Sequence, residues 1–233
     1  MGRYYWNYLV TLAILLVIFG GCAKPATIPM PSLEQAEVIN LPEPRYDSDV
    51  SIEQSLLNRR SIRSYTGEPL TLQELSQLLW ATQGITDPRG FRTAPSAGGL
   101  YPLELYLVAG DVEDLISGVY WYKPDGHQLI KTMDGDSRAE LADAALAQSW
   151  VKDGAVSIVL TAVYERTTDK YGERGIRYIH MEAGHAAQNL CLQAIAMGLG
   201  TVTVGAFHDE QVTKLLNLTE DEQPLYVIPI GRK

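Results

Sequence analysis

Three arginines and a serine lie within five residues, at Arg59, Arg60, Ser61 and Arg63. Guanidinium and hydroxyl groups so close together suit a phosphate dianion and the polar edge of a ring, because guanidinium donors bind oxyanions in pairs. A solvated basic turn without a ligand would have the same composition. We treat residues 59–63, called the arginine turn below, as a candidate phosphate site.

Two further segments could bind a ligand through backbone amides, whereas the arginine turn would bind it through charged side chains. Residues 95–102 read P-S-A-G-G-L-Y-P and are called the small-residue loop. Small side chains let backbone amides approach a flat ligand closely, and prolines fix the entry and exit of such a loop. An ordinary rigid loop would look the same. Residues 198–207, G-L-G-T-V-T-V-G-A-F, are called the glycine segment, and its residues 202–207 carry no side chain able to clamp phosphate.

Two familiar motifs fail on their context. A dinucleotide-binding glycine loop leaves a strand and opens a helix, whereas the glycine segment leaves a helix and enters a strand. His180 and His185 bracket Glu182. A spacing of five residues turns the two imidazoles about 140° apart on a helix, so they cannot share a metal ion as an i, i+4 pair does. No metal site is predicted.

The chain that must position these segments has 233 residues, of which 46% are hydrophobic and 20% charged, as in one ordinary folded domain. Its formal net charge is −9. A surface this acidic repels phosphate backbones, so nucleic acid is not an expected partner. Two cysteines cannot form a disulfide framework.

The first 22 residues have the pattern of an address. An apolar run of twelve residues, 8–19, is followed by Gly20, Gly21 and Cys22. The run is short for a membrane span, so we predict a lipoprotein signal at 1–22 with lipidation of Cys22. An uncleaved anchor helix is the alternative. Both place the protein at a membrane, and the lipoprotein would be extracytoplasmic. Residues 23–49 hold five prolines and are predicted to be an extended tether to a domain at 50–233.

The pattern of elements in that domain favours an α+β fold. A capping box at Thr71–Glu74 opens a helix, residues 156–163 form a continuous apolar run typical of a central strand, and residues 175–197 carry a long helical stripe. Other strands are expected at 103–109, 119–122, 128–131, 201–204 and 225–230. Strands and helices do not alternate as they do in a doubly wound sheet.

Taken in order, the motifs resemble those of the nitroreductase superfamily, and within it the SagB/ThcOx-type dehydrogenase branch. They are R-R-S-x-R at 59–63, P-S-A-G-G-L-Y-P at 95–102, E-A-G-H-x-A-Q-N-L at 182–190, G-L-G-T with V-G-A-F at 198–207, and P-I-G-R at 229–232. The resemblance covers roughly residues 50–233. It implies a dimeric three-layer fold with a central mixed, mainly antiparallel sheet flanked by helices.

The resemblance further implies FMN at a dimer interface. The side chains of the arginine turn would contact phosphate, ribityl chain and pyrimidine edge. Ser96, Ala97 and Gly99 would line the ring on the same subunit. Arg232 matches the family's terminal basic residue and would be a second phosphate clamp. The other subunit would contribute Thr203, Val204, Gly205 and Ala206 against the face of the ring. The Gly205 amide would be aimed at flavin N5.

Lys170 and Tyr171 resemble the pair proposed as acid/base residues in azoline-oxidising members, although a polar loop would also contain them. We therefore expect an oxidoreductase that transfers hydride through flavin N5. Its substrate would be a small acceptor, such as a nitroaromatic or quinone, or a peptide or heterocycle oxidised in SagB-like fashion. A lipoprotein that binds flavin or another ligand without turnover is the alternative.

A homodimer is also expected from the long helix itself. Residues 183, 184, 186 and 187 are alanines and a glycine, which would let a second helix approach closely. A bulky charge at Ala187 is predicted to weaken the dimer and flavin binding together.

Overall fold

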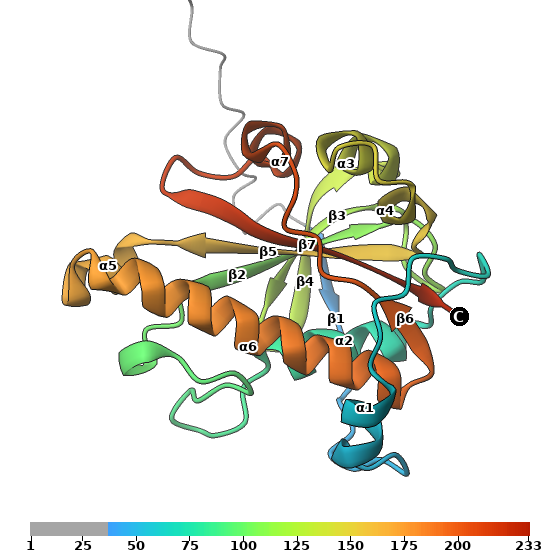
Figure 1. Ribbon diagram of the computed structural model, residues 1–233, viewed down its shortest axis with the longest axis horizontal. Coiled ribbons are helices and arrows are strands. Elements are labelled where there is room, and N and C mark those ends of the chain that lie inside the picture. The colour runs from blue at the N-terminus through green and yellow to red at the C-terminus, as the bar shows by residue number, and fades with distance from the viewer. Residues whose placement is uncertain (1–36) are drawn as a thin grey trace, which may run out of the picture.

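The computed structural model describes residues 37–233, which form one seven-stranded sheet with helices on both faces (Figure 1). The strand order is β1-β4-β3-β2-β5-β7-β6, and every neighbouring pair is antiparallel. The predicted α+β class is confirmed. The strands are β1 Val38–Asn40, β2 Leu103–Ala109, β3 Gly118–Lys123, β4 Gln128–Asp134, β5 Val156–Val163, β6 Leu199–Thr201 and β7 Glu222–Arg232.

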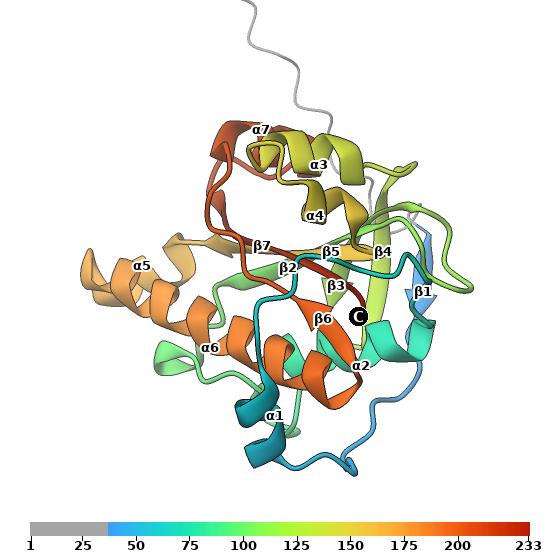
Figure 2. The same ribbon diagram turned by 45° about the vertical axis from the view of Figure 1, so that its right-hand side comes forward.

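Two groups of helices cover the sheet, as both ribbon views show (Figures 1 and 2). One face carries α1, α2 and α6, and the other carries α3, α4 and α7, so the fold has three layers. The helices are α1 Ile52–Asn58, α2 Leu72–Gln83, α3 Arg138–Ala144, α4 Ser149–Asp153, α5 Glu165–Tyr171, α6 Arg174–Ala196 and α7 Asp209–Leu216, with a 3₁₀ turn η1 at Ala97–Gly99.

Burial explains why the sheet is built around β5. This strand lies between β2 and β7, and seven of its eight residues are buried. Its side chains alternate between the two cores: Ile158 and Leu160 face the α2 and α6 side, while Val159 faces the α3, α4 and α7 side. Each such side chain contributes about 1.5–3 kcal/mol by leaving water. The continuous apolar run therefore becomes the central strand, as predicted.

The capping box and the long helix were also predicted correctly. Thr71 Oγ1 accepts a hydrogen bond from the Glu74 amide at 3.2 Å, and Glu74 Oε2 accepts one from the Thr71 amide at 2.8 Å. Helix α6 runs for 23 residues and buries one face against the sheet. These two helices pack against each other in one layer.

The N-terminal predictions fall largely outside the described residues. Residues 1–22, including Cys22, and the first part of the expected tether are among them. Within the described part, Val38–Asn40 is not a tether but an edge strand, because its residues pair with β4. No helix in residues 37–233 is long and apolar enough to cross a membrane. This finding contradicts the predicted membrane-associated, extracytoplasmic location, and that prediction is withdrawn.

Candidate functional site

The arginine turn and the glycine segment lie side by side in one chain. Ser61 forms a parallel bridge with Thr201, and the Ile62 amide donates to the Thr201 carbonyl at 3.0 Å. Gly200 is required at this contact, since a Cβ there would lie 2.7 Å from the Ile62 side chain. The turn that carries the guanidiniums is therefore fixed to the end of β6.

The side chains of the arginine turn leave two guanidiniums and a hydroxyl available. Arg60 is turned back on the backbone, donating to the carbonyls of Leu57 and Arg59 at 3.0 and 2.7 Å. Ser61 and Arg63 are exposed, and Arg59 is half-buried at the end of α1. Available cations beside a hydroxyl are what an oxyanion site needs.

Two residues beside the turn carried no signal in the sequence motifs. The Arg63 guanidinium lies over the Trp150 ring, 5.5 Å from its centre. The buried indole N–H of Trp150 has no hydrogen-bond partner among residues 37–233. Gln148, next to it at the start of α4, donates to the Ala206 carbonyl at 3.0 Å. Helix α4 thus joins the arginine turn to the glycine segment.

The last part of the glycine segment presents backbone, as predicted. Val204 is buried and pairs with Val227, whereas Thr203, Gly205 and Ala206 are exposed. The Gly205 amide has no hydrogen-bond partner within residues 37–233. An exposed, unpartnered amide beside small residues can bind the edge of a flat ligand.

The small-residue loop stands against Lys170 and Tyr171. Gly98 has φ +66°, and a Cβ there would lie 2.8 Å from Tyr171 Oη and 2.9 Å from Lys170 Nζ. Only glycine is compatible with both the backbone conformation and these contacts. Gly99, at φ +67°, has open space where its Cβ would be. The acid/base candidates and the loop therefore form one group.

These two groups lie apart along α6. The small-residue loop is near the end of α6 that follows α5, and α1 with the arginine turn is near the other end (Figures 1 and 2). At that second end, burial raises the pKa of the Cys191 thiol and the nearby Arg59 guanidinium opposes the rise. Within one chain the arginine turn is thus next to the glycine segment, while the small-residue loop is distant from both, and the assignment of these segments to the two subunits stays a prediction.

Arg232 is bound elsewhere in the fold. Its guanidinium donates to both Glu74 carboxylate oxygens, at 3.0 and 2.9 Å, and to the Pro69 carbonyl at 3.0 Å. The bidentate pair ties β7 to the start of α2. In this structure the guanidinium has a carboxylate partner, and its predicted role as a second phosphate clamp stays a prediction.

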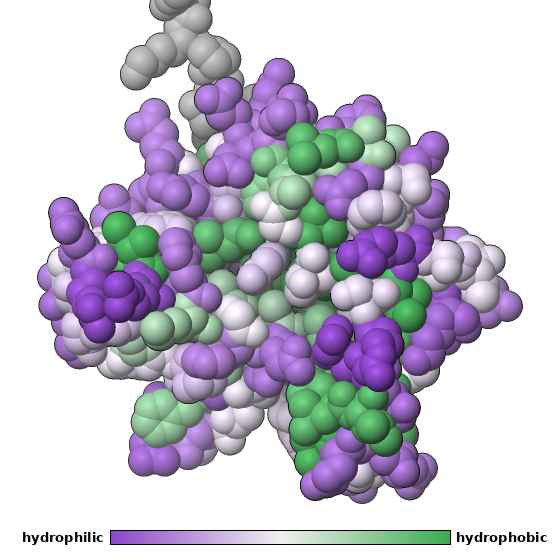
Figure 3. Space-filling model, viewed as in Figure 1, coloured by the Kyte–Doolittle hydropathy of each residue, from purple (hydrophilic) through white to green (hydrophobic). Residues whose placement is uncertain are grey.

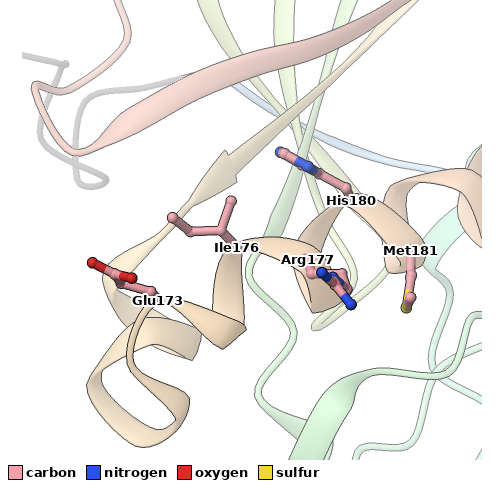
Figure 4. A pocket seen from close by; sticks show the side chains of 5 residues that line it. All are labelled: Glu173, Ile176, Arg177, His180 and Met181. Carbon is pink, nitrogen blue, oxygen red and sulfur yellow. The ribbon is translucent and has the colours of Figure 1, made fainter.

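An open groove of about 650 Å³ follows the exposed side of α6 (Figure 4). It is lined by Glu173, Ile176, Arg177, His180 and Met181. His180 Nε2 lies 2.8 Å from the Tyr164 hydroxyl, so this imidazole is held by a neighbour in its own chain.

A family model described as the nitroreductase family matches residues 56–232. The chain belongs to the nitroreductase family. A protein of Methanocaldococcus jannaschii, a nitroreductase by name, is 48% identical over 185 residues, which are 79% of this chain and 92% of that protein. An FMN reductase of Bacillus subtilis is 24% identical over 195 residues, 76% of this chain and 61% of the relative.

Solved structures agree with the family. A Ralstonia eutropha protein named as a nitroreductase has a TM-score of 0.74 at 31% identity, covering 88% of this chain and 94% of that one. A chain of the Escherichia coli microcin synthetase McbBCD complex, solved with truncated pro-MccB17 bound, has a TM-score of 0.66 at 25% identity, covering 91% and 85%. The predicted nitroreductase-like three-layer fold of the chain is confirmed. The family is one of flavin-dependent oxidoreductases for which FMN, the predicted cofactor, is typical.

Proposed function

We propose that this protein is an FMN-dependent oxidoreductase whose flavin site is shared between two copies of the chain. One copy supplies the arginine turn and the glycine segment, and the other supplies the small-residue loop with Lys170 and Tyr171. One observation carries the proposal. The two groups lie near opposite ends of α6 in a single chain, yet each has polar groups available to bind a ligand.

The residues present fit FMN. Arg59, Ser61 and Arg63 would hold the phosphate or the polar ring edge, and the unpartnered Trp150 N–H lies beside Arg63. The open space at Gly99 would admit the flat ring. FMN supplies hydride transfer when bound. The Gly205 amide would donate a hydrogen bond at the reacting edge, and the cations of the turn favour an anionic reduced ring.

The position of Lys170 and Tyr171 favours a dehydrogenase over a simple reductase of small acceptors. Both side chains reach the loop that would line the ring, so an ammonium and a phenol would be at hand to exchange protons with a substrate. The likeness to a chain of the microcin synthetase complex supports a peptide or heterocycle substrate, as in the SagB-type branch. A nitroaromatic or quinone acceptor is the second candidate.

We expect FMN to co-purify with the chain without a covalent bond. Denaturation should release a yellow chromophore that mass spectrometry identifies as FMN, at one per chain. Anaerobic titration with NADH and NADPH should then bleach the bound flavin with the donor that the enzyme uses. Bound FMN that no donor or substrate reduces would favour the binding-only alternative, and FAD or no flavin after reconstitution would contradict the site.

The exposed surface supports a dimer, but through other residues than the sequence indicated. Ala183, Ala186 and Ala187 pack in the chain's own core, and Gly184 alone of the four lies on the exposed face of α6. Near α1, Ile52, Leu56 and Leu57 are 55, 55 and 71% exposed and form an apolar patch at the lower right of Figure 3. Together with Ile176 and Met181 on α6, this surface suits a second copy.

Gly184→Glu should therefore replace Ala187→Glu as the test of the dimer. A Cβ at Gly184 would meet nothing within 4 Å, so the change should leave the monomer folded and favour the helix by up to about 1 kcal/mol. Sedimentation should show a weaker dimer, with FMN lost in parallel. The control is Ala139→Glu, at an exposed position of α3 on the opposite face. A Gly184→Glu dimer as tight as wild type would exclude this face.

A further inference from the structure

The carboxyl of Glu182 has no part in the site described so far. The residue lies on α6 and is 2% exposed. Its Oε1 has no hydrogen-bond partner within residues 37–233. A buried, unpartnered carboxyl oxygen is costly, so its presence in a native fold calls for a specific explanation.

The groups that act on Glu182 come from the small-residue loop and its entry. Burial raises the pKa of the Glu182 carboxyl to about 7, while the Ser96 hydroxyl, as a hydrogen-bond donor, and the Arg92 guanidinium oppose the rise. Arg92 is the charged group whose field acts on this carboxyl. Helix α6, which carries Glu182, also packs against the 3₁₀ turn η1 of the loop, so Glu182 faces the loop.

Asn189 holds the same stretch of chain from the same face of α6. Its side-chain amide donates to the Thr93 carbonyl at 3.2 Å. Residues seven positions apart lie on one side of a helix, two turns from each other. Helix α6 therefore contacts the entry to the loop at two points, and the two residues belong to the E-A-G-H-x-A-Q-N-L motif.

The loop is closed on itself, so a contact at Ser96 fixes more than Ser96. The Tyr101 amide donates to Ser96 Oγ at 2.9 Å, and the Arg92 amide donates to the Tyr101 hydroxyl at 3.1 Å. The Arg92 guanidinium also lies 4.6 Å from the Tyr101 ring centre and donates to Gln83 of α2 at 3.0 Å. Displacing Ser96 would disturb both ends of the loop.

We propose that Glu182 is a positioning residue, which together with Asn189 fixes the small-residue loop in the conformation that receives the flavin ring. The inference rests on the proposed function. Glu182 touches no reacting atom and acts through Ser96 and Arg92. This positioning role accounts for the motif at 182–190, which contains none of the residues assigned to the cofactor.

The proton on Glu182 supplies a readout. Because the folded-state pKa is raised from 4.5 to about 7, the folded chain binds a proton that the unfolded chain has lost between those pH values. Stability therefore falls as pH rises through that window and levels off above it. Burial outweighs the Ser96 and Arg92 contacts in the folded chain, so the carboxyl is neutral when it is buried against the anchored loop, and flavin affinity should fall as pH rises through about 7.

The test compares Glu182→Ala, Glu182→Gln and the exposed-carboxyl control Glu113→Gln in the full chain. Dissociation constants of FMN and riboflavin are measured by flavin fluorescence from pH 5 to 8. Glu182→Ala should weaken both flavins about tenfold, since the loop meets the ring and not the phosphate. Glu182→Gln, which keeps the shape and cannot ionise, should bind as wild type does at pH 5 and keep that affinity to pH 8. Glu113→Gln should follow the wild-type pH profile.

The outcomes separate the two proposals. If wild type binds no FMN, the proposed function is wrong and the inference with it. If wild type binds FMN while Glu182→Gln keeps the wild-type pH profile, the proposed function stands and the positioning role is refuted. Should Glu182→Ala not fold, the pH profile of Glu182→Gln decides alone.

Discussion

Mixing two inactive variants should restore about a quarter of the wild-type flavin sites. One variant is Arg63→Ala, which removes a cation from the phosphate side, and the other is Gly99→Glu, which fills the open space at the small-residue loop. In random dimers about half are mixed, and each mixed dimer has one site carrying both lesions and one site carrying neither. The recovery of a quarter of the flavin sites is expected because each site takes its arginine turn from one chain and its small-residue loop from the other.

Each variant alone should bind FMN poorly. Losing a charge-assisted hydrogen bond of about 1.5–3 kcal/mol lowers affinity roughly 10- to 150-fold for Arg63→Ala. Gly99→Glu adds a side chain at φ +67°, which also strains the backbone by about 1–2 kcal/mol. Gly67→Glu, at φ +82° with open space around it, controls for that strain away from the site.

The measurement is bound FMN per chain after the two variants are co-expressed or refolded together. If one chain held the whole site, every site in a mixed dimer would carry one lesion, and mixing would restore nothing. In the mixture of Arg63→Ala with Gly67→Glu, bound FMN per chain should be proportional to the share of Gly67→Glu chains. Full FMN binding by a monomer would also refute the shared site.

The sequence predicted the local structure well, for a physical reason. The capping box of α2 and the buried strand β5 depend on neighbours in the chain and on an apolar run, and both lie where expected. The candidate segments were found by composition, since clustered guanidiniums and consecutive small residues are visible without a fold.

What the sequence missed depends on contacts between distant parts of the chain. The pairing of Arg232 with Glu74, 158 positions away in the chain, has no local signal in the sequence. The grouping of the segments depended on the bridge between Ser61 and Thr201, which no local pattern indicates. The small-residue stripe of α6 was read as an interface, although an alanine packs equally well in its own core. The spacing of residues along a helix predicts which of them share a face, but it does not predict whether that face packs on the same chain or on a second copy.

The Lys170 and Tyr171 pair gives the second large expected effect. Tyr171→Phe and Lys170→Ala should each lower the rate of oxidation of an azoline-containing peptide by roughly 10²- to 10⁴-fold, the usual contribution of a positioned acid or base. The rate at which a quinone reoxidises the reduced enzyme should change by about twofold or less in the same variants. In this reaction Lys170 and Tyr171 exchange no proton with a peptide substrate.

Tyr178→Phe is the matched control for Tyr171→Phe. The two rings meet edge to face with centroids 5.3 Å apart, so both variants lose a hydroxyl from the same aromatic contact. Only Tyr171 directs its hydroxyl at Gly98. If Tyr178→Phe slows peptide oxidation as much as Tyr171→Phe does, the aromatic contact and not the proton matters. If the peptide is not oxidised by wild type while quinone turnover is fast in every variant, the enzyme is a reductase of small acceptors, and Lys170 and Tyr171 only support the loop.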